Sequence, residues 1–155
     1  MNGGQSDDSA VPTSSLVTHA SVEVSAGLVF RAGQLLITQR LIGAHLAGLW
    51  EFPGGKREPG ESFEACLRRE LHEELGVTVC VHEEIERITH SYPEKTVHLR
   101  FFRCTLADAD AVPRPIACQA VAWVTRETLG NYTFPAADAR LLKRVRAAEL
   151  WWTPV

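Results

Sequence analysis

The chain has 155 residues, of which 45% are hydrophobic and 23% are charged, and its formal net charge is −3 at pH 7. These proportions are typical of a soluble globular protein with one domain and a substantial core. The negative balance argues against bulk binding to nucleic acid, which needs a basic surface. No apolar run reaches the roughly 18 residues that span a membrane.

The first 19 residues are polar and rich in Gly, Ser and Asp, and we expect a flexible leader there. This segment has neither the basic nor the apolar part of a secretory signal, so a cytoplasmic location is expected. Residues 20–155 are predicted to form a single domain. Four scattered cysteines form no C-x-x-C pair and are predicted to be buried, reduced thiols. They are Cys66, Cys80, Cys104 and Cys118.

Strand patterns follow the leader. Residues 21–31 and 34–40 are rich in β-branched and aliphatic side chains, and Ala32-Gly33 between them predicts a hairpin. Residues 43–62 contain five glycines and two prolines, which predicts a long loop with at most a short strand at 50–52.

A helix is predicted to begin after Ser62 and to run to Leu75. Ser62 is a good N-cap, Glu64 complements the positive end of the helix dipole, and Gly76 supplies the C-terminal stop. An apolar side chain recurs every four residues and forms one stripe. The stripe consists of Phe63, Leu67, Leu71 and Leu75.

Two long strands are predicted next, over 77–92 and 95–106, with a turn at Tyr92-Pro93-Glu94. A short strand at 120–124 and a helix at 138–150 complete the chain. This order predicts an α/β (α+β) protein in which two helices pack against one sheet system.

Three glutamates share one face of the first helix, because Glu70, Glu73 and Glu74 are spaced i, i+3, i+4. Like charges at these spacings destabilise a helix by a few tenths of a kcal/mol per pair. Divalent cations would relieve the repulsion, and oxygen-only ligands favour Mg²⁺ or Mn²⁺. Arg69 can pair with a carboxylate and orient it. A solvated acidic face is the alternative for these residues taken alone.

A longer pattern surrounds the glutamates in residues 55–77. The nine positions are Gly55, Glu61, Arg69, Glu70, Leu71, Glu73, Glu74, Gly76 and Val77. The window resembles a complete Nudix box, and the likeness extends from about residue 22 to about residue 142. It is similar to MutT-type nucleoside triphosphate pyrophosphohydrolases, including enzymes that cleave 8-oxo-dGTP.

The resemblance implies a Nudix fold, an α/β/α sandwich around a mixed β-sheet. It implies Mg²⁺-dependent attack of water on a nucleoside triphosphate, with Mn²⁺ able to replace Mg²⁺, releasing a monophosphate and pyrophosphate in sanitation of the nucleotide pool. Metal ligands and a supporting shell are implied by position. The ligands would be Glu70, Glu73, Glu74 and the Gly54 carbonyl, and the shell Glu61 and Arg69. The implied catalytic set is Glu73, Glu61, Arg69 and Glu70.

Five further positions match the substrate side of the family. Arg40 would contact phosphate, and Lys56 lies next to the loop that carries the implied Gly54 ligand. Phe52 and Tyr92 would flank the base, and Asp138 would form hydrogen bonds with its edge. Each has a structural alternative: Arg40 as a surface cation, Tyr92 as a turn residue, and Asp138 as an N-cap.

Two departures leave alternatives open. Bacterial MutT carries asparagine where this chain has Asp138, and pyrimidine-cleaving relatives carry aspartate, so a CTP-type or broad specificity is a second hypothesis. Ala117 stands where relatives carry a glutamate, which leaves the general base open between Glu73 and Glu61. A non-catalytic nucleotide-binding module is a third hypothesis. Monomer and homodimer are both compatible with the sequence.

Overall fold

A mixed sheet forms the centre of the computed structural model, which describes residues 20–154. Its strands run in the order β3–β2–β1–β6–β5, while β4 pairs with β1 and β7 pairs with β2. Only β1 and β6 are parallel among these pairs. The strands are β1 (Ala20–Arg31), β2 (Gln34–Gln39), β3 (Trp50–Glu51), β4 (Gly54–Lys56), β5 (Val79–Ser91), β6 (Lys95–Leu106) and β7 (Ala120–Val124).

The predicted first hairpin is confirmed, and Ala32 and Gly33 have φ angles of 50° and 77°. Positive φ at both turn residues is the geometry that joins antiparallel strands through two residues. The prediction of a loop up to residue 62 was incomplete, because β4 lies within it and pairs with β1. Two of its three residues are glycines, which have low strand propensity and gave no local signal.

Helix α1 (Phe63–Leu75) has the predicted bounds. The Ser62 hydroxyl accepts a hydrogen bond from the Ala65 amide at 3.0 Å, and Gly76 ends the helix at φ 68°. Four side chains of α1 are buried, and the three leucines among them pack with Val29, Leu36 and Phe102 of the sheet. The four are Cys66, Leu67, Leu71 and Leu75. Phe63 is only half-buried, so the predicted stripe begins one turn later.

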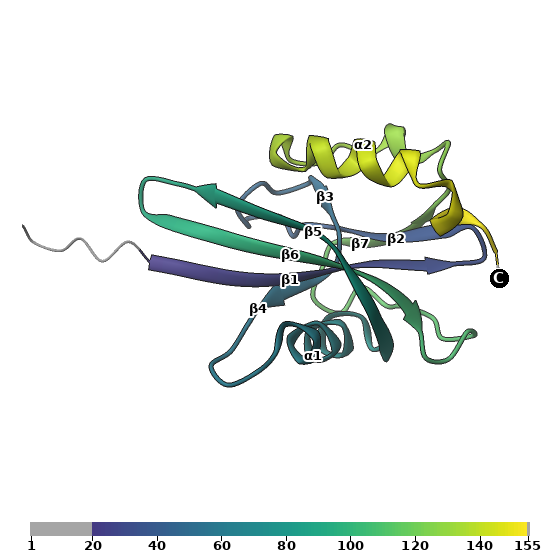
Figure 1. The fold of residues 1–155 in the computed structure, drawn as a ribbon, viewed down its shortest axis with the longest axis horizontal. Helices are drawn as coiled ribbons and strands as arrows, with labels where there is room; N and C mark the ends of the chain where they lie inside the picture. The colour runs from purple at the N-terminus through teal and green to yellow at the C-terminus, as the bar shows by residue number, and fades with distance from the viewer. Residues whose placement is uncertain (1–19, 155) are drawn as a thin grey trace, which may run out of the picture.

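Helix α2 (Ala139–Ala147) covers the opposite face of the sheet from α1 (Figure 1). It is shorter than predicted, because short 3-10 helices replace its two ends. These are η2 (Ala136–Asp138) and η3 (Glu149–Trp152), and a further one, η1 (Leu129–Asn131), precedes them. The chain leaves the helix at Ala148, and the buried Trp152 indole then donates to the Val145 carbonyl at 2.9 Å. The predicted sandwich around a mixed sheet is confirmed.

The cysteines follow the prediction in part. All four are free, and Cys66 and Cys104 are buried, but Cys80 is exposed and Cys118 is half-buried. No helix within residues 20–154 is long and apolar enough to cross a membrane. The predicted leader lies outside the described residues.

Candidate active site

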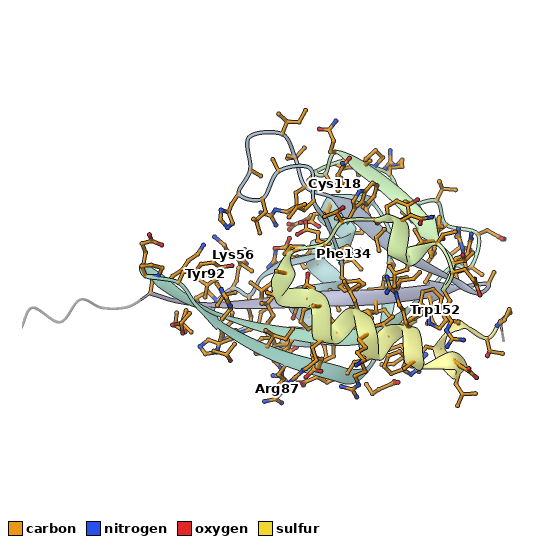
Figure 2. The ribbon with its side chains drawn as sticks, turned by 90° about the horizontal axis from the view of Figure 1, so that it is seen from above. Lys56, Arg87, Tyr92, Cys118, Phe134 and Trp152 are labelled. Atoms are coloured by element: carbon orange, nitrogen blue, oxygen red, sulfur yellow. The ribbon has the colours of Figure 1, made fainter. Side chains whose placement is uncertain are left out.

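A cleft of about 450 Å³ runs over strands β1 and β6. One end is polar and is formed by Glu51, Gly54, Gly55, Lys56 and Glu74. The floor is apolar and is formed by Val22, Val24, Val97, Leu99 and Phe101. Lys56 and Tyr92 lie toward the same end of the sheet, and Phe134 lies nearer the middle (Figure 2). The cleft therefore joins a region suited to charged groups to one suited to a flat apolar group.

Arg69 binds four acidic or carbonyl groups beside this cleft. Its Nε and Nη2 donate to the two carboxylate oxygens of Glu61 at 2.9 and 2.7 Å. Its Nη1 lies 3.0 Å from Glu70 Oε1 and 3.3 Å from Glu73 Oε2, and Nη2 also donates to the Lys56 carbonyl. Glu70 and Glu73 thus share an arginine partner, which the helix pattern alone did not show.

The Arg69 guanidinium also fixes the charge of Glu61. Its hydrogen bond, aided by the Glu58 amide, lowers the pKa of Glu61 to about 2. The same contact raises the pKa of Arg69. Both groups are therefore charged at neutral pH, and they form a bidentate, charge-assisted pair of hydrogen bonds beside Glu70 and Glu73.

Glu70 lies directly against the backbone of the glycine loop. A Cβ atom on Gly55 would lie 2.2 Å from Glu70 Cδ, and a Cβ on Gly54 would lie 1.9 Å from the Ser25 carbonyl oxygen. Glycine is therefore required at position 54, where it lets β4 approach β1, whereas Gly55 leaves room for the Glu70 carboxylate in its present position.

Glu74 lines the polar end of the cleft. Burial, followed by repulsion from Glu70 and Glu51, raises the pKa of Glu74 to about 8. The cleft thus holds more negative charge than its side chains can neutralise, which suits a bound cation.

Glu51 is a cleft residue that sequence reasoning missed. Burial raises its pKa, against the opposing effect of Arg40, whose Nη1 lies 2.7 Å from Glu51 Oε2. An acidic residue between Trp50 and Phe52, inside an otherwise apolar stretch, was the available signal. Arg40, predicted to contact phosphate, lines the cleft but is held by Glu51 and by the His45 carbonyl at 2.5 Å.

The predicted base-side aromatic residues differ in exposure. Phe52 is only 5% exposed, and its ring packs on Phe101 and Phe134 at centroid distances of 6.1 and 5.2 Å. It is therefore part of the cleft wall and is too covered to be an open stacking platform. Tyr92 lies at the rim, where its ring meets those of His90 at 4.4 Å and His45 at 6.2 Å.

Asp138 lines the cleft near Pro135 and Ala137. It occupies the N-cap position of α2, as the structural alternative expected, but its side chain forms no capping hydrogen bond. Within residues 20–154 the carboxylate has no hydrogen-bond or ion-pair partner. Burial and repulsion from Glu51 raise the pKa of Asp138 to about 6. An unpartnered carboxyl group here can accept or donate hydrogen bonds according to its protonation.

The fit of a metal ion depends on donor chemistry and charge. Among residues 20–154, no three His, Cys, Asp or Glu side chains converge closely enough to hold a metal ion. Glu73 is 58% exposed and turned to Arg69, and Ala117 lines the cleft beside Glu74 without offering a carboxylate. The donors are nevertheless all oxygens, and the repulsion on Glu74 favours a hard divalent cation. A cation therefore fits the chemistry of the site, provided that Glu73 turns from Arg69.

An α/β/α sandwich with a carboxylate-bearing helix beside its cleft is the arrangement that the Nudix resemblance implied. The family model described as NUDIX domain matches residues 25–144. The chain therefore belongs to the Nudix family, as the box implied, and Nudix hydrolases generally use a divalent metal ion.

Three similar proteins match this chain over most of its length and over most of their own. An 8-oxo-dGTP diphosphatase of Haemophilus influenzae is 37% identical over 80% of this chain and 90% of its own. A CTP pyrophosphohydrolase of Escherichia coli is 35% identical over 81% and 92%. The solution structure of the E. coli ORF135 protein covers 86% of this chain and 94% of its own, with a TM-score of 0.72 at 34% identity. With relatives named as diphosphatases and pyrophosphohydrolases, this chain is a MutT-type Nudix hydrolase and not a non-catalytic module.

Proposed function

We propose that this hydrolase cleaves nucleoside triphosphates to a nucleoside monophosphate and pyrophosphate with Mg²⁺, and that 8-oxo-dGTP or a related oxidised nucleotide is its substrate in sanitation of the nucleotide pool. One observation carries the proposal: a single cleft is lined by the acidic Glu74, by the apolar strand floor and by the unpartnered Asp138. The 8-oxo-dGTP diphosphatase of H. influenzae supports the choice of substrate.

Glu70, Glu73 and Glu74, with the Gly54 carbonyl, would hold Mg²⁺. When bound, Mg²⁺ neutralises phosphate charge and lowers the pKa of a bound water. In the reaction the water oxygen bonds to phosphorus, and the bridging P–O bond breaks to release the leaving phosphate group. Lys56, at the polar end of the cleft, would balance phosphate charge.

The water must also lose a proton to a carboxylate. Glu61 is a poor acceptor, because its pKa of about 2 and its double hydrogen bond to Arg69 hold it ionised and occupied. Glu73 has one longer contact at 3.3 Å and is more exposed. Of the two open choices for the general base, these contacts support Glu73, one oxygen of which would accept the proton while the other binds the ion.

The test measures pyrophosphate release from a panel of nucleotides with Mg²⁺, for the wild type and for Glu73→Gln. Loss of about 100-fold or more in kcat is expected for the variant. Glu64→Gln is the matched control, since Glu64 lies on the same helix but, within residues 20–154, forms no ion pair with Arg69 as Glu73 does. A wild type that is as inactive as Glu73→Gln on every nucleotide would contradict the proposal.

A CTP-type or broad specificity is the second candidate function. The aspartate at position 138 and the similarity to the E. coli CTP pyrophosphohydrolase favour it. Comparing kcat/KM for 8-oxo-dGTP and CTP separates the two, because this ratio measures discrimination between substrates.

A further inference from the structure

Leu46 has a backbone conformation that its position does not explain. Its φ angle is 57°, in the left-handed region that side chains other than glycine rarely adopt. Ala32 is the other non-glycine residue with positive φ within residues 20–154, and its two-residue hairpin requires that angle. Leu46 lies in the 41–49 loop, which is the part of the segment between β2 and β3 that follows Arg40. No two-residue hairpin requires a positive φ angle at Leu46.

The 41–49 loop forms one side of the cleft. Leu41, Ala44, His45 and Leu46 line it, whereas Ile42 is 83% exposed and does not. Contacts at both ends hold the loop in place: the Arg40 amide donates to the Leu49 carbonyl at 2.9 Å, and Arg40 Nε donates to the His45 carbonyl. The loop also reaches the β5–β6 hairpin, because the His45 ring meets Tyr92 edge-on.

Leu46 and the apolar floor residues line the same cleft. Leu46 is an exposed large hydrophobic residue, 40% exposed, although it lines the cleft. A strained backbone persists only where surrounding structure maintains it, and such strain is concentrated at functional sites. Here Arg40 and the turn from Leu46 to Leu49, closed by a 3.2 Å hydrogen bond, are the structure that maintains it.

We propose that Leu46 is a specificity-determining residue, whose left-handed conformation holds an apolar side chain against the base of the bound nucleotide. The inference rests on the proposed function, since the ligand that it names is a nucleotide. The base would lie between Leu46 on one side and the strand floor of Val22, Val97 and Leu99 on the other. Glycine would suit the backbone better but would remove this wall, so stability and binding oppose each other at this position.

Two variants separate the side chain from the backbone strain. Leu46→Gly removes both, whereas Leu46→Ala removes the side chain and keeps the strain. Both variants should bind the nucleoside monophosphate product about tenfold more weakly in titration calorimetry with Mg²⁺. Pyrophosphate, which has no base, should bind all proteins equally. KM should rise in the same proportion while kcat changes less than about twofold.

Thermal unfolding reports the strain independently of activity. Leu46→Gly should have a higher Tm than Leu46→Ala, because glycine adopts positive φ without a steric penalty. Ile42→Gly is the matched control for added loop flexibility, since it places a glycine in the same loop at a side chain outside the cleft. It should leave the binding of both ligands unchanged.

The proposal fails if the Leu46 variants bind the monophosphate as tightly as the wild type, or if Ile42→Gly weakens binding equally. A Tm for Leu46→Gly at or below that of Leu46→Ala overturns the strain argument. These failures differ from failure of the proposed function, in which the wild type itself would hydrolyse no nucleotide in the panel.

Discussion

Arg69 and Glu61 form a double hydrogen bond, with Nε–Oε2 at 2.9 Å and Nη2–Oε1 at 2.7 Å. The same guanidinium reaches Glu70 and Glu73 with its remaining Nη1 group. Arg69 therefore determines where two of the proposed metal ligands lie, and it does so from a position that Glu61 keeps fixed. A planar fork of this kind is available to arginine and not to lysine.

Arg69→Lys is therefore expected to lower kcat by about 10- to 100-fold, because the carboxylates lose their orientation while the positive charge remains. Steady-state kinetics with Mg²⁺ would measure this. Arg68→Lys is the control, since Arg68 is the exposed neighbour on the same helix and forms no ion pair within residues 20–154. Unchanged kcat in Arg69→Lys would show that the fork has no part in catalysis.

The acidic surroundings of Glu74 lead us to expect that divalent cations stabilise the folded protein. Its carboxylate is repelled by Glu70 and Glu51, so a bound cation should stabilise the folded state. We expect the Tm of the wild type to rise by several degrees with Mg²⁺ and to return on chelation with EDTA, with an increase less than about half as large in Glu74→Gln. Equal increases in both proteins would place the cation elsewhere.

Asp138 should make nucleotide binding depend on pH. Its pKa of about 6 means that it accepts hydrogen bonds at neutral pH and becomes a partial donor when protonated. For a base that presents donor groups, KM should rise as the pH falls from about 7.5 to about 5. Asp138→Asn cannot ionise, so its KM should lack this change. A pH profile shared by both proteins would exclude Asp138 as its source.

The same shift has a consequence for stability. Because burial favours the neutral acid, the pKa is higher in the folded state than the ordinary value of 3.8. The stabilisation from Asp138 is therefore fully present below about pH 4 and is lost as the pH rises through about 6. In urea unfolding, the free energy of unfolding of the wild type relative to Asp138→Asn should therefore fall between about pH 4 and about pH 7, because groups common to both proteins cancel in this difference.

Gly54 and Gly55 should respond differently to the same substitution. Gly54→Ala places Cβ 1.9 Å from a backbone oxygen of β1, so we expect a loss of about 3 kcal/mol or more in the free energy of unfolding. Gly55→Ala meets only the end of the Glu70 side chain, which can turn away. That variant should fold but bind Mg²⁺ about 10- to 100-fold more weakly. Denaturant unfolding and metal titration would distinguish them, and a Gly54→Ala protein as stable as Gly55→Ala would contradict this account.

The local features of the chain could be predicted from its sequence. Helix α1, its Ser62 cap and its Gly76 stop follow from interactions within a few residues, and so does the Ala32-Gly33 hairpin. The spacing of the glutamates also placed them on one helix face, and the Nudix box identified the family. These properties depend on periodicity and on short-range chemistry, which a single sequence displays directly.

Contacts between distant segments were decided only by the tertiary structure. Pairing of β4 with β1 follows from the room that Gly54 leaves, and neither strand signals it alone. Glu51 became a cleft residue because β3 brings it to Arg40, and Asp138 was left without a partner because a 3-10 turn precedes α2. Burial and charge at these positions are sums over neighbours from several elements. The sequence by itself thus determined the helix, the hairpin and the family, whereas folding decided which carboxylates are paired, which are buried, and which face the cleft.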